Sequence, residues 1–176
     1  MSGIEKVGVV GAGVMGAAIA AHAANAGVSV VLLDIVPKDG ANRNALAEGA
    51  VAAMMKQSPA PFMHRRNAKR ITCGNLEDDL DLFSECDWIV EAIVENPAIK
   101  QDLYKRIDGV RKPGSIVTSN TSTIPLARLV EGLPDSLVAD FAITHFFNPP
   151  RYMRLLEIVA GPNTRSDAID ALTRFG

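Results

Sequence analysis

Apolar runs and alanine-rich stretches alternate along the first part of the chain. Residues 4–10 form an apolar run that ends at a glycine, which predicts a buried strand. Residues 28–33 form a second such run, closed by Asp34. Between them, residues 14–26 are alanine-rich and unbroken until Gly27, which favours a helix with a glycine just past its end. The pattern therefore begins as strand, helix, strand.

The segment after Asp34 interrupts this alternation. Residues 42–56 are rich in alanine and methionine and predict a helix, which the prolines within residues 58–61 end. A locally basic stretch follows at residues 64–70. It is either a solvated helix face or a contact for a phosphorylated ligand. Together these segments predict a helical insertion between the second and third strands.

The alternation then resumes to the end of the chain. Further strands are expected at residues 71–72, 87–92, 115–119, 138–146 and 155–159, and further helices at residues 97–107 and 166–175. Alternating strands and helices favour a parallel sheet covered on both faces. We therefore predict a doubly wound, Rossmann-type α/β fold with a mostly parallel sheet, a helical insertion after the second strand, and one domain over residues 1–176.

A glycine-rich turn follows the first predicted strand. Its residues are Gly11, Ala12, Gly13, Val14, Met15 and Gly16, in the pattern GxGxxG. The first glycine permits a tight turn, the second lets a pyrophosphate approach the backbone, and the third lets helix and strand pack closely. The helix that follows presents free N–H groups and its positive dipole end to the phosphates. All six residues are therefore predicted to contact a dinucleotide.

Asp34 indicates which dinucleotide is preferred. It lies 18 residues after Gly16, at the end of the second predicted strand. A carboxylate there accepts hydrogen bonds from ribose hydroxyls and repels a 2′-phosphate, and no arginine follows at once to receive one. NAD is therefore the predicted cofactor. The alternative is a structural glycine turn with a capping aspartate.

The second half of the chain carries an ordered series of short motifs. They are EAIVEN at residues 91–96, Lys100, SNTS at residues 119–122, HFFNP at residues 145–149, and Leu156-Glu157. In this order the series resembles the NAD-binding domain of the L-3-hydroxyacyl-CoA dehydrogenase family. The resemblance extends from about residue 4 to the end of the chain.

The resemblance implies roles for the residues that match. His145 matches the catalytic histidine of the family, and Glu157 matches its carboxylate partner. Ser122 and Asn148 match residues that contact the substrate oxygen or the nicotinamide end. Lys56, in the helical insertion, can take the part of a lysine that contacts coenzyme A. For residues 119–122 a simple turn-and-cap role is the alternative.

The same resemblance implies the rest of the cofactor site. Glu95, Lys100 and Asn120 match positions near the cofactor, and Asp34 matches the acid that binds the ribose. The family commonly has a valine-proline-valine stretch after HFFNP, where this chain has Pro-Arg-Tyr-Met at residues 150–153. That variant is more similar to the long, multidomain members of fatty-acid oxidation.

The positions of His145 and Glu157 in the sequence are consistent with the chemistry that the resemblance implies for them. Oxidising a secondary alcohol requires a base with a pKa near neutrality, and a carboxylate on the far ring nitrogen fixes the tautomer of a histidine. If the last two strands pair antiparallel about Arg151, residues whose numbers sum to 302 face each other. His145 and Glu157 meet that condition. An isolated histidine is more often structural, but this pairing favours catalysis.

Composition argues against nucleic-acid, membrane and metal-binding functions. The formal net charge is −2 and 22% of residues are charged, so no basic surface indicates nucleic acid or an anionic membrane. No apolar run approaches the length of a bilayer span, residues 1–6 lack a basic signal-peptide start, and a cytoplasmic location is expected. No metal site is expected. Cys73 and Cys86, which lack CxxC spacing, are expected to be half-buried thiols.

The predicted reaction transfers a hydride between the 3-hydroxyl carbon of an L-3-hydroxyacyl-CoA and NAD. The family has a second, helical domain for substrate binding and dimerisation, which residues 1–176 do not include. We therefore expect a homo-oligomer or a multidomain protein, and weak activity from this chain by itself. Two alternatives stay open, namely a dehydrogenase of the same plan for a hydroxy acid without coenzyme A and a non-catalytic NAD-binding module.

Overall fold

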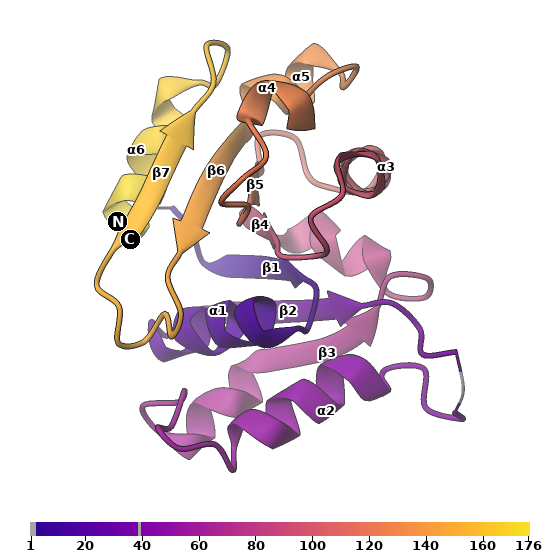
Figure 1. Ribbon diagram of the computed structural model, residues 1–176, viewed down its shortest axis with the longest axis vertical. Coiled ribbons are helices and arrows are strands. Elements are labelled where there is room, and N and C mark those ends of the chain that lie inside the picture. The colour runs from indigo at the N-terminus through magenta and orange to yellow at the C-terminus, as the bar shows by residue number, and fades with distance from the viewer. Residues whose placement is uncertain (1–2, 39) are drawn as a thin grey trace.

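The computed structural model describes residues 3–38 and 40–176, and its strands form one seven-stranded sheet (Figure 1). The strands are β1 (Lys6–Val10), β2 (Ser29–Asp34), β3 (Ile71–Asn75), β4 (Trp88–Glu91), β5 (Ile116–Ser119), β6 (Phe141–Phe146) and β7 (Leu156–Ala160). Their order is β3-β2-β1-β4-β5-β6-β7, and only β7 is antiparallel to its neighbour. Residues 1 and 2, which belong to the segment expected to lack an export signal, lie outside the described residues.

Helices cover both faces of this sheet. They are α1 (Val14–Asn25), α2 (Ala45–Met54), α3 (Pro97–Asp108), α4 (Leu126–Leu129), α5 (Asp135–Ala139) and α6 (Ser166–Phe175), with short 3-10 helices η1 (Arg65–Arg70) and η2 (Leu80–Glu85). Residues of α1, α2 and α6 share one apolar cluster with the sheet, and residues of α3, α4, α5 and η2 share the other. The doubly wound, mostly parallel prediction is confirmed, and α2 and η1 form the insertion between β2 and β3.

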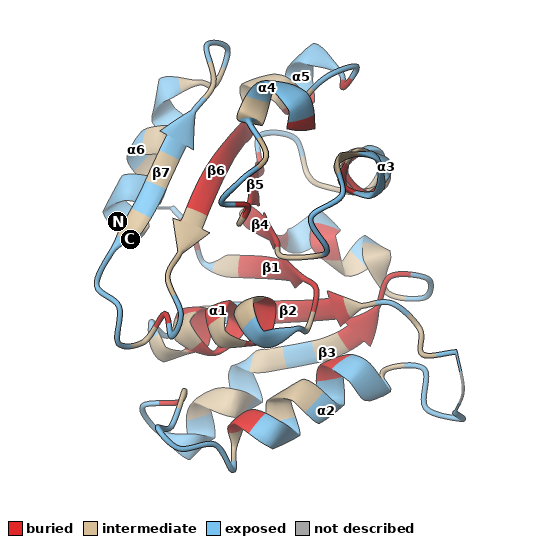
Figure 2. Ribbon diagram, in the orientation of Figure 1, coloured by how far each residue is buried: buried red, intermediate tan, exposed pale blue. Residues whose placement is uncertain are grey.

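Burial follows the position of each strand in the sheet. The central strands are almost entirely buried, whereas β7 at the edge is partly exposed (Figure 2). Buried parallel strands read as continuous apolar runs, which explains why the sequence predicts β1 and β2 so clearly.

Two predicted elements require correction. The strand expected at residues 138–146 begins only at Phe141, because residues 135–139 form the one-turn helix α5 after Pro134 and bury Leu137. The strand expected at residues 71–72 continues to Asn75, because it pairs with β2 along its whole length. Helices α4 and α5 are not anticipated by the apolar pattern.

The pairing of the last two strands confirms the expected register. The antiparallel ladder joins Ala142 to Ala160 and His145 to Glu157, so the numbers of facing residues sum to 302. Directly facing residues have their side chains on the same face of the sheet. The pairing of β6 with β7 therefore brings the side chains of His145 and Glu157 together.

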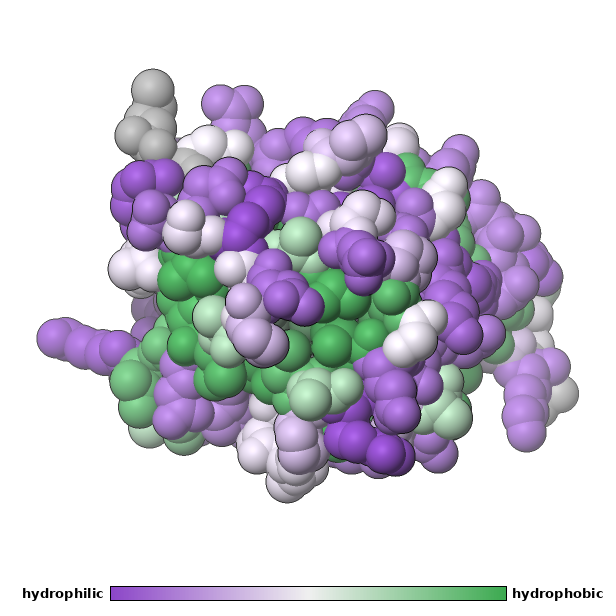
Figure 3. Space-filling model, turned by 90° about the horizontal axis from the view of Figure 1, so that it is seen from above, coloured by the Kyte–Doolittle hydropathy of each residue, from purple (hydrophilic) through white to green (hydrophobic). Residues whose placement is uncertain are grey.

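The end of the molecule that carries α4 and α5 is apolar at its centre. Seen from above, apolar residues gather in one area surrounded by polar residues (Figure 3). The short helices at this end supply partly buried side chains, among them Leu126, Val130 and Val138, to the second core cluster. Part of the second core cluster is therefore covered by side chains that are not fully buried.

Both cysteines are thiols held away from solvent. Cys73 is half-buried as expected, whereas Cys86 is fully buried because it belongs to the second core cluster, and its Sγ lies 3.7 Å from the carbonyl oxygen of Leu82. Burial raises the pKa of Cys86 to about 12 and that of the half-buried Cys73 to about 11. Both therefore stay protonated at neutral pH.

Candidate active site

The glycine turn between β1 and α1 is sterically constrained at two of its three glycines. Gly11 has a φ of 96°, and a Cβ on it would lie 2.6 Å from the carbonyl oxygen of Ala92. A Cβ on Gly16 would lie 1.8 Å from the carbonyl oxygen of Gly11. Only glycine fits at these positions, because real Cβ atoms do not approach backbone so closely.

Gly13 differs from the other two glycines, because it faces open space. A Cβ built on it has no atom within 4 Å. No side chain caps the N-terminus of α1, which begins at Val14, so its first N–H groups are free to receive an anion. A sterically forced turn beside an open helix terminus fits the pyrophosphate of a dinucleotide.

Asp34 is joined directly to this turn. Its Oδ2 accepts a hydrogen bond from the backbone N–H of Ala12 (2.6 Å), and its Oδ1 accepts one from that of Ile35 (2.6 Å). The side chain is half-buried at the end of β2. The carboxylate therefore lies beside the predicted phosphate site with its orientation fixed by two backbone donors.

The His145–Glu157 pair lies at the end of β6. His145 Nδ1 is 2.7 Å from Glu157 Oε2, with 21% of the histidine side chain and 52% of the glutamate side chain exposed. The Phe147 ring lies 4.5 Å from the imidazole, centre to centre. Among the described residues, none hydrogen-bonds to Nε2. The ring is thus held at one nitrogen and open at the other.

This pair and the glycine turn lie at the same edge of the sheet. His145 lies at the carboxyl end of β6 and the glycine turn follows the carboxyl end of β1, and β4 and β5 separate these two parallel strands. Three strand spacings place them roughly 14 Å apart across the sheet. Open α/β sheets bind ligands at this edge, where the strand order reverses.

The loop after β5 carries the predicted Asn120 and Ser122. Asn120 Oδ1 accepts a hydrogen bond from the backbone N–H of Phe146 (2.9 Å), which joins this loop to the end of β6 beside His145. Ser122 is exposed, and so is Asn148, which follows β6. The structure therefore brings Asn120 next to the histidine and leaves the other two side chains open to a ligand.

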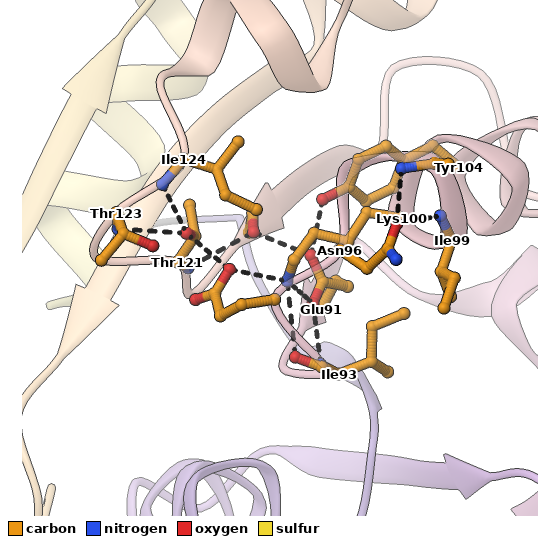
Figure 4. A network of polar contacts seen from close by, with 12 residues as sticks. Glu91, Ile93, Asn96, Ile99, Lys100, Tyr104, Thr121, Thr123 and Ile124 are labelled. Atoms are coloured by element: carbon orange, nitrogen blue, oxygen red, sulfur yellow. Dashed lines mark hydrogen bonds and ion pairs between the residues drawn. The ribbon is translucent and has the colours of Figure 1, made fainter.

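The predicted cofactor residues Glu95 and Lys100 belong to one polar network, in which Lys100 and Thr121 are labelled in Figure 4. Glu95 is exposed, and its Oε2 accepts a hydrogen bond from Thr121 Oγ1 (2.9 Å). Lys100 has only 1% of its side chain exposed, and its ammonium is 2.5 Å from Glu91 Oε1. The sequence predicts no role for Glu91, because the three side chains that hydrogen-bond to it lie 9, 13 and 28 residues away.

The helical insertion is tied to the turn after β6. The guanidinium of Arg151 donates to the carbonyl oxygens of Ala60 and Phe62, and the Tyr152 hydroxyl donates to that of Ala60 (3.1 Å). A hollow of about 350 Å³ lies between this turn, α2 and Gly13. Lys56, the predicted contact for coenzyme A, is exposed just after α2.

A larger hollow of about 500 Å³ lies on the other face of β6. Phe146, Trp88 and Phe175 contribute to its mostly apolar walls. Successive strand residues point to opposite faces, so Phe146 faces this hollow while His145 faces away from it. The larger hollow is therefore separate from the His145–Glu157 pair.

Two features are absent from residues 3–38 and 40–176. No helix there is long and apolar enough to cross a bilayer. No three of the histidine, cysteine, aspartate and glutamate side chains in these ranges gather as a metal site would require.

Comparisons with known proteins identify the family of this chain. Residues 6–176 match the family described as 3-hydroxyacyl-CoA dehydrogenase, NAD binding domain. A Deinococcus radiodurans protein described as a probable 3-hydroxyacyl-CoA dehydrogenase is 45% identical over 98% of this chain and 50% of its own length. A Rickettsia felis protein described as a putative fatty acid oxidation complex trifunctional enzyme is 46% identical over 98% of this chain and 24% of its own length.

Solved structures give the same result. A 3-hydroxybutyryl-CoA dehydrogenase from Escherichia coli superposes with a TM-score of 0.81 and 26% identity, over 97% of this chain and 35% of that one. This chain thus spans between about a quarter and a half of the length of these three relatives. The expectations of a family resemblance and of NAD as cofactor are confirmed. The chain belongs to the NAD-binding domain family of 3-hydroxyacyl-CoA dehydrogenases.

Proposed function

We propose that this chain is the cofactor-binding and acid–base part of an enzyme that interconverts an L-3-hydroxyacyl-CoA and the matching 3-ketoacyl-CoA, as in fatty-acid oxidation. The observation that carries the proposal is the 2.7 Å contact between His145 Nδ1 and Glu157 Oε2. It leaves Nε2 available at the edge of the sheet where the glycine turn lies. Names of the relatives support the substrate class.

In the oxidising direction, His145 acts as the base. Its Nε2 takes the proton from the 3-hydroxyl group, the C3–H bond breaks with loss of hydride, and the carbonyl double bond forms. NAD⁺, when bound, supplies the hydride acceptor. Glu157 keeps the proton on Nδ1 and stabilises the imidazolium that results. In the reducing direction, the imidazolium returns its proton to the carbonyl oxygen.

Exposed polar side chains around the pair complete the proposed substrate site. Ser122 and Asn148 are suited to donate hydrogen bonds to the 3-oxygen as its charge changes during the reaction. Glu95 and Asn120 frame the nicotinamide end, and both are anchored by hydrogen bonds within the domain. The exposed Lys56 is proposed to contact coenzyme A.

The remaining cofactor contacts are proposed at the glycine turn. Residues 11–16 present the turn and the free helix terminus to the pyrophosphate, and Asp34 receives the adenosine ribose hydroxyls. The carboxylate also excludes a 2′-phosphate by charge repulsion. We therefore expect NAD to be strongly preferred over NADP.

Residues 1–176 are proposed to act as one domain of a longer enzyme. The curated relatives reported above are two to four times as long as the part that this chain matches. The proposed remainder is helical, binds the acyl-CoA and carries the contacts of a homo-oligomer or of a multidomain protein, located in the cytoplasm. Without it, the substrate site is open to water on one side, so turnover by this chain is expected to be slow.

Titration calorimetry tests the cofactor half of the proposal. We expect saturable binding of NADH, with at least a tenfold preference over NADPH. A preference for NADPH would overturn the assignment of Asp34. The substrate half is tested by single-turnover oxidation of NADH with acetoacetyl-CoA, in the presence and absence of free coenzyme A. Activity that free coenzyme A does not inhibit would show that the coenzyme A part of the substrate is not recognised, which is the outcome expected for an enzyme of hydroxy acids without coenzyme A.

A further inference from the structure

The turn between β6 and β7 reaches back to the helical insertion. Arg151 and Tyr152 lie on this turn, six and seven residues after His145. The backbone of the turn closes on itself, because the N–H groups of Tyr152 (2.9 Å) and Met153 (3.0 Å) both donate to the carbonyl oxygen of Pro149. Figure 1 shows the turn beside the last turn of α1. Both side chains are therefore carried by a hydrogen-bonded backbone segment.

Three consecutive carbonyl groups of the insertion are held by side chains from outside it. They belong to residues 60, 61 and 62, in the loop after α2. Arg151 donates to the first and the third, and Tyr152 donates to the first. Asn25, at the end of α1, donates to the second (2.9 Å). The loop is thus joined to α1 by Asn25 and to the turn after β6 by Arg151 and Tyr152, which together we call the clamp.

In the described parts of the chain, the clamp is the only polar link between the insertion and the last two strands. Residues 42–70 and 141–160 are all described, and no other hydrogen bond or ion pair joins them. Under the loop, the third core cluster buries four side chains, two of which are alanines of α1. Alanine methyl groups offer only a shallow surface to the loop. The clamp therefore determines how far the loop lies from β6.

The charge of Arg151 is used on carbonyl groups instead of on a carboxylate. No aspartate or glutamate in residues 3–38 and 40–176 pairs with it, and its guanidinium lies 5.1 Å from the centre of the Tyr152 ring. A planar guanidinium holds several donors in fixed directions, so one side chain can hold two carbonyl oxygens of a loop. Burial, and secondly the charge of Arg151, lower the pKa of His22 on α1, so no second cation arises here at neutral pH.

The two ends of the clamp carry different parts of the proposed substrate site. Asn148, just before the turn, belongs to the proposed contacts of the reacting end, and Lys56, just after α2, is the proposed contact for coenzyme A. The hollow of about 350 Å³ lies between α2 and the turn, with Asn148 and Arg151 in its wall. The covalent chain from the nucleotide to the 3-carbon has the same length in every acyl-CoA. That carbon therefore reaches His145 correctly only if the insertion stays at one distance from it.

We propose that Arg151, assisted by Tyr152, is a positioning residue, which holds the helical insertion at the distance from His145 that a coenzyme A thioester requires. The clamp thereby makes the enzyme prefer coenzyme A esters to thioesters that lack the nucleotide. It acts through the position of the insertion and not on the reacting atoms. The inference rests on the proposed function, because that function assigns the coenzyme A contact to the insertion.

The test is Arg151→Met, which keeps a long side chain and removes its donors. Single-turnover oxidation of NADH is measured with acetoacetyl-CoA and with acetoacetyl-pantetheine, which has the same reacting group but no nucleotide. We expect the second-order rate constant to fall at least tenfold with the coenzyme A ester and to stay within twofold with the shorter thioester. The N–H of Met63, which donates to Asn25 Oδ1, should exchange at least fivefold faster, because its loop is then held on one side only.

The matched control is Arg154→Met, which removes a cation close to the same turn. Among the described residues, Arg154 has no hydrogen bond or ion pair. The control should leave the preference for the coenzyme A ester and the exchange of Met63 within twofold of the original values. An equal loss of preference in Arg154→Met would show that the turn attracts the phosphates by its charge, and it would overturn the positioning role.

A second variant, Tyr152→Phe, covers the case in which Arg151→Met does not fold. It removes one hydroxyl from an exposed side chain, and we expect a two- to fivefold loss of the preference. Rates that fall equally with both thioesters, or an unchanged preference in both variants, would overturn the positioning role. So would an original chain that uses the two thioesters equally well. An original chain that is inactive with both would instead contradict the proposed function, whereas the exchange of Met63 still tests the clamp.

Discussion

The proposed cofactor side and the proposed catalytic side of this domain differ in what fixes their geometry. At the glycine turn, backbone atoms leave no room for a side chain on Gly11 or Gly16, so the site is fixed by contact within a few residues. At the end of β6, His145 meets Glu157 across an antiparallel pair at the partly exposed edge of the sheet. One side depends on local sterics and the other on strand register, so each can be disrupted without the other.

Of the changes considered, His145→Ala is expected to have the largest effect, because it should abolish catalysis and leave cofactor binding intact. Loss of the base should lower the single-turnover rate with acetoacetyl-CoA and NADH at least hundredfold, because general acid–base catalysis contributes about 10²- to 10⁴-fold. NADH affinity, measured by calorimetry, should stay within twofold, since the glycine turn is untouched. A rate within threefold of the original would support a non-catalytic NAD-binding role.

The glycine turn can be broken in two distinguishable ways. Gly16→Ala places a methyl group against the Gly11 carbonyl oxygen, so we expect the free energy of unfolding to fall by about 3 kcal/mol, at the upper end of overpacking costs. Gly13→Ala has open space around the new methyl group and should unfold like the original chain. Both should weaken NADH binding at least tenfold. Unchanged NADH affinity in Gly13→Ala would show that the pyrophosphate lies elsewhere.

A milder change on the proposed catalytic side is Glu157→Gln. The amide can still contact Nδ1 but no longer stabilises the imidazolium by charge, so we expect a tenfold or greater loss of single-turnover rate. The unfolding midpoint and NADH affinity should be unaffected, because the side chain is half exposed. Glu157→Asp, which keeps the charge but shortens the reach, serves as the comparison. Full activity in Glu157→Gln would remove the carboxylate from the mechanism.

The smallest expected effect is that of changing Asp87, which lies at the opposite end of the sheet from both proposed sites. Partial burial opposes ionisation of Asp87, but hydrogen bonds from Lys112 and from the backbone of Glu5 and Lys6 outweigh it and lower the pKa of this carboxyl below its usual range. The stability from its charge is therefore full above the ordinary pKa and is lost as pH falls through the lower, folded-state pKa.

Asp87→Asn should remove this dependence. We expect roughly 1 kcal/mol less stability at pH 7 and a flatter decline of unfolding free energy below pH 4, measured by urea unfolding at several pH values. NADH affinity should be unchanged. A variant that declines with acid as steeply as the original would contradict the assignment of this carboxyl.

The glycine turn and the His145–Glu157 pair also differ in how directly the sequence predicts them. The glycine turn and Asp34 are readable because their function needs only neighbours along the chain. His145 and Glu157 become readable once the register of two strands is assumed, and the structure confirms that register. The short helices after Pro125 and Pro134 are missed, because one turn of helix carries too little periodicity to recognise.

The buried Glu91–Lys100 ion pair could not be predicted from the sequence. Glu91 reads only as the polar end of a strand, since its partners lie 2, 9, 13 and 28 residues away. A faint signal exists in α3, where Lys100 and Tyr104 are four residues apart and so share the face that also buries Leu103. Without the fold, nothing connects that face to the end of β4.

The two unreactive thiols make the domain convenient for spectroscopic labelling. The thiolate is the species that attacks a maleimide, and burial raises the pKa of Cys73 and Cys86 to about 11 and about 12. A cysteine introduced at an exposed position such as Ser122 would therefore react first at neutral pH. The native sequence serves as its own background for a fluorophore or spin label placed at the edge of the proposed active site.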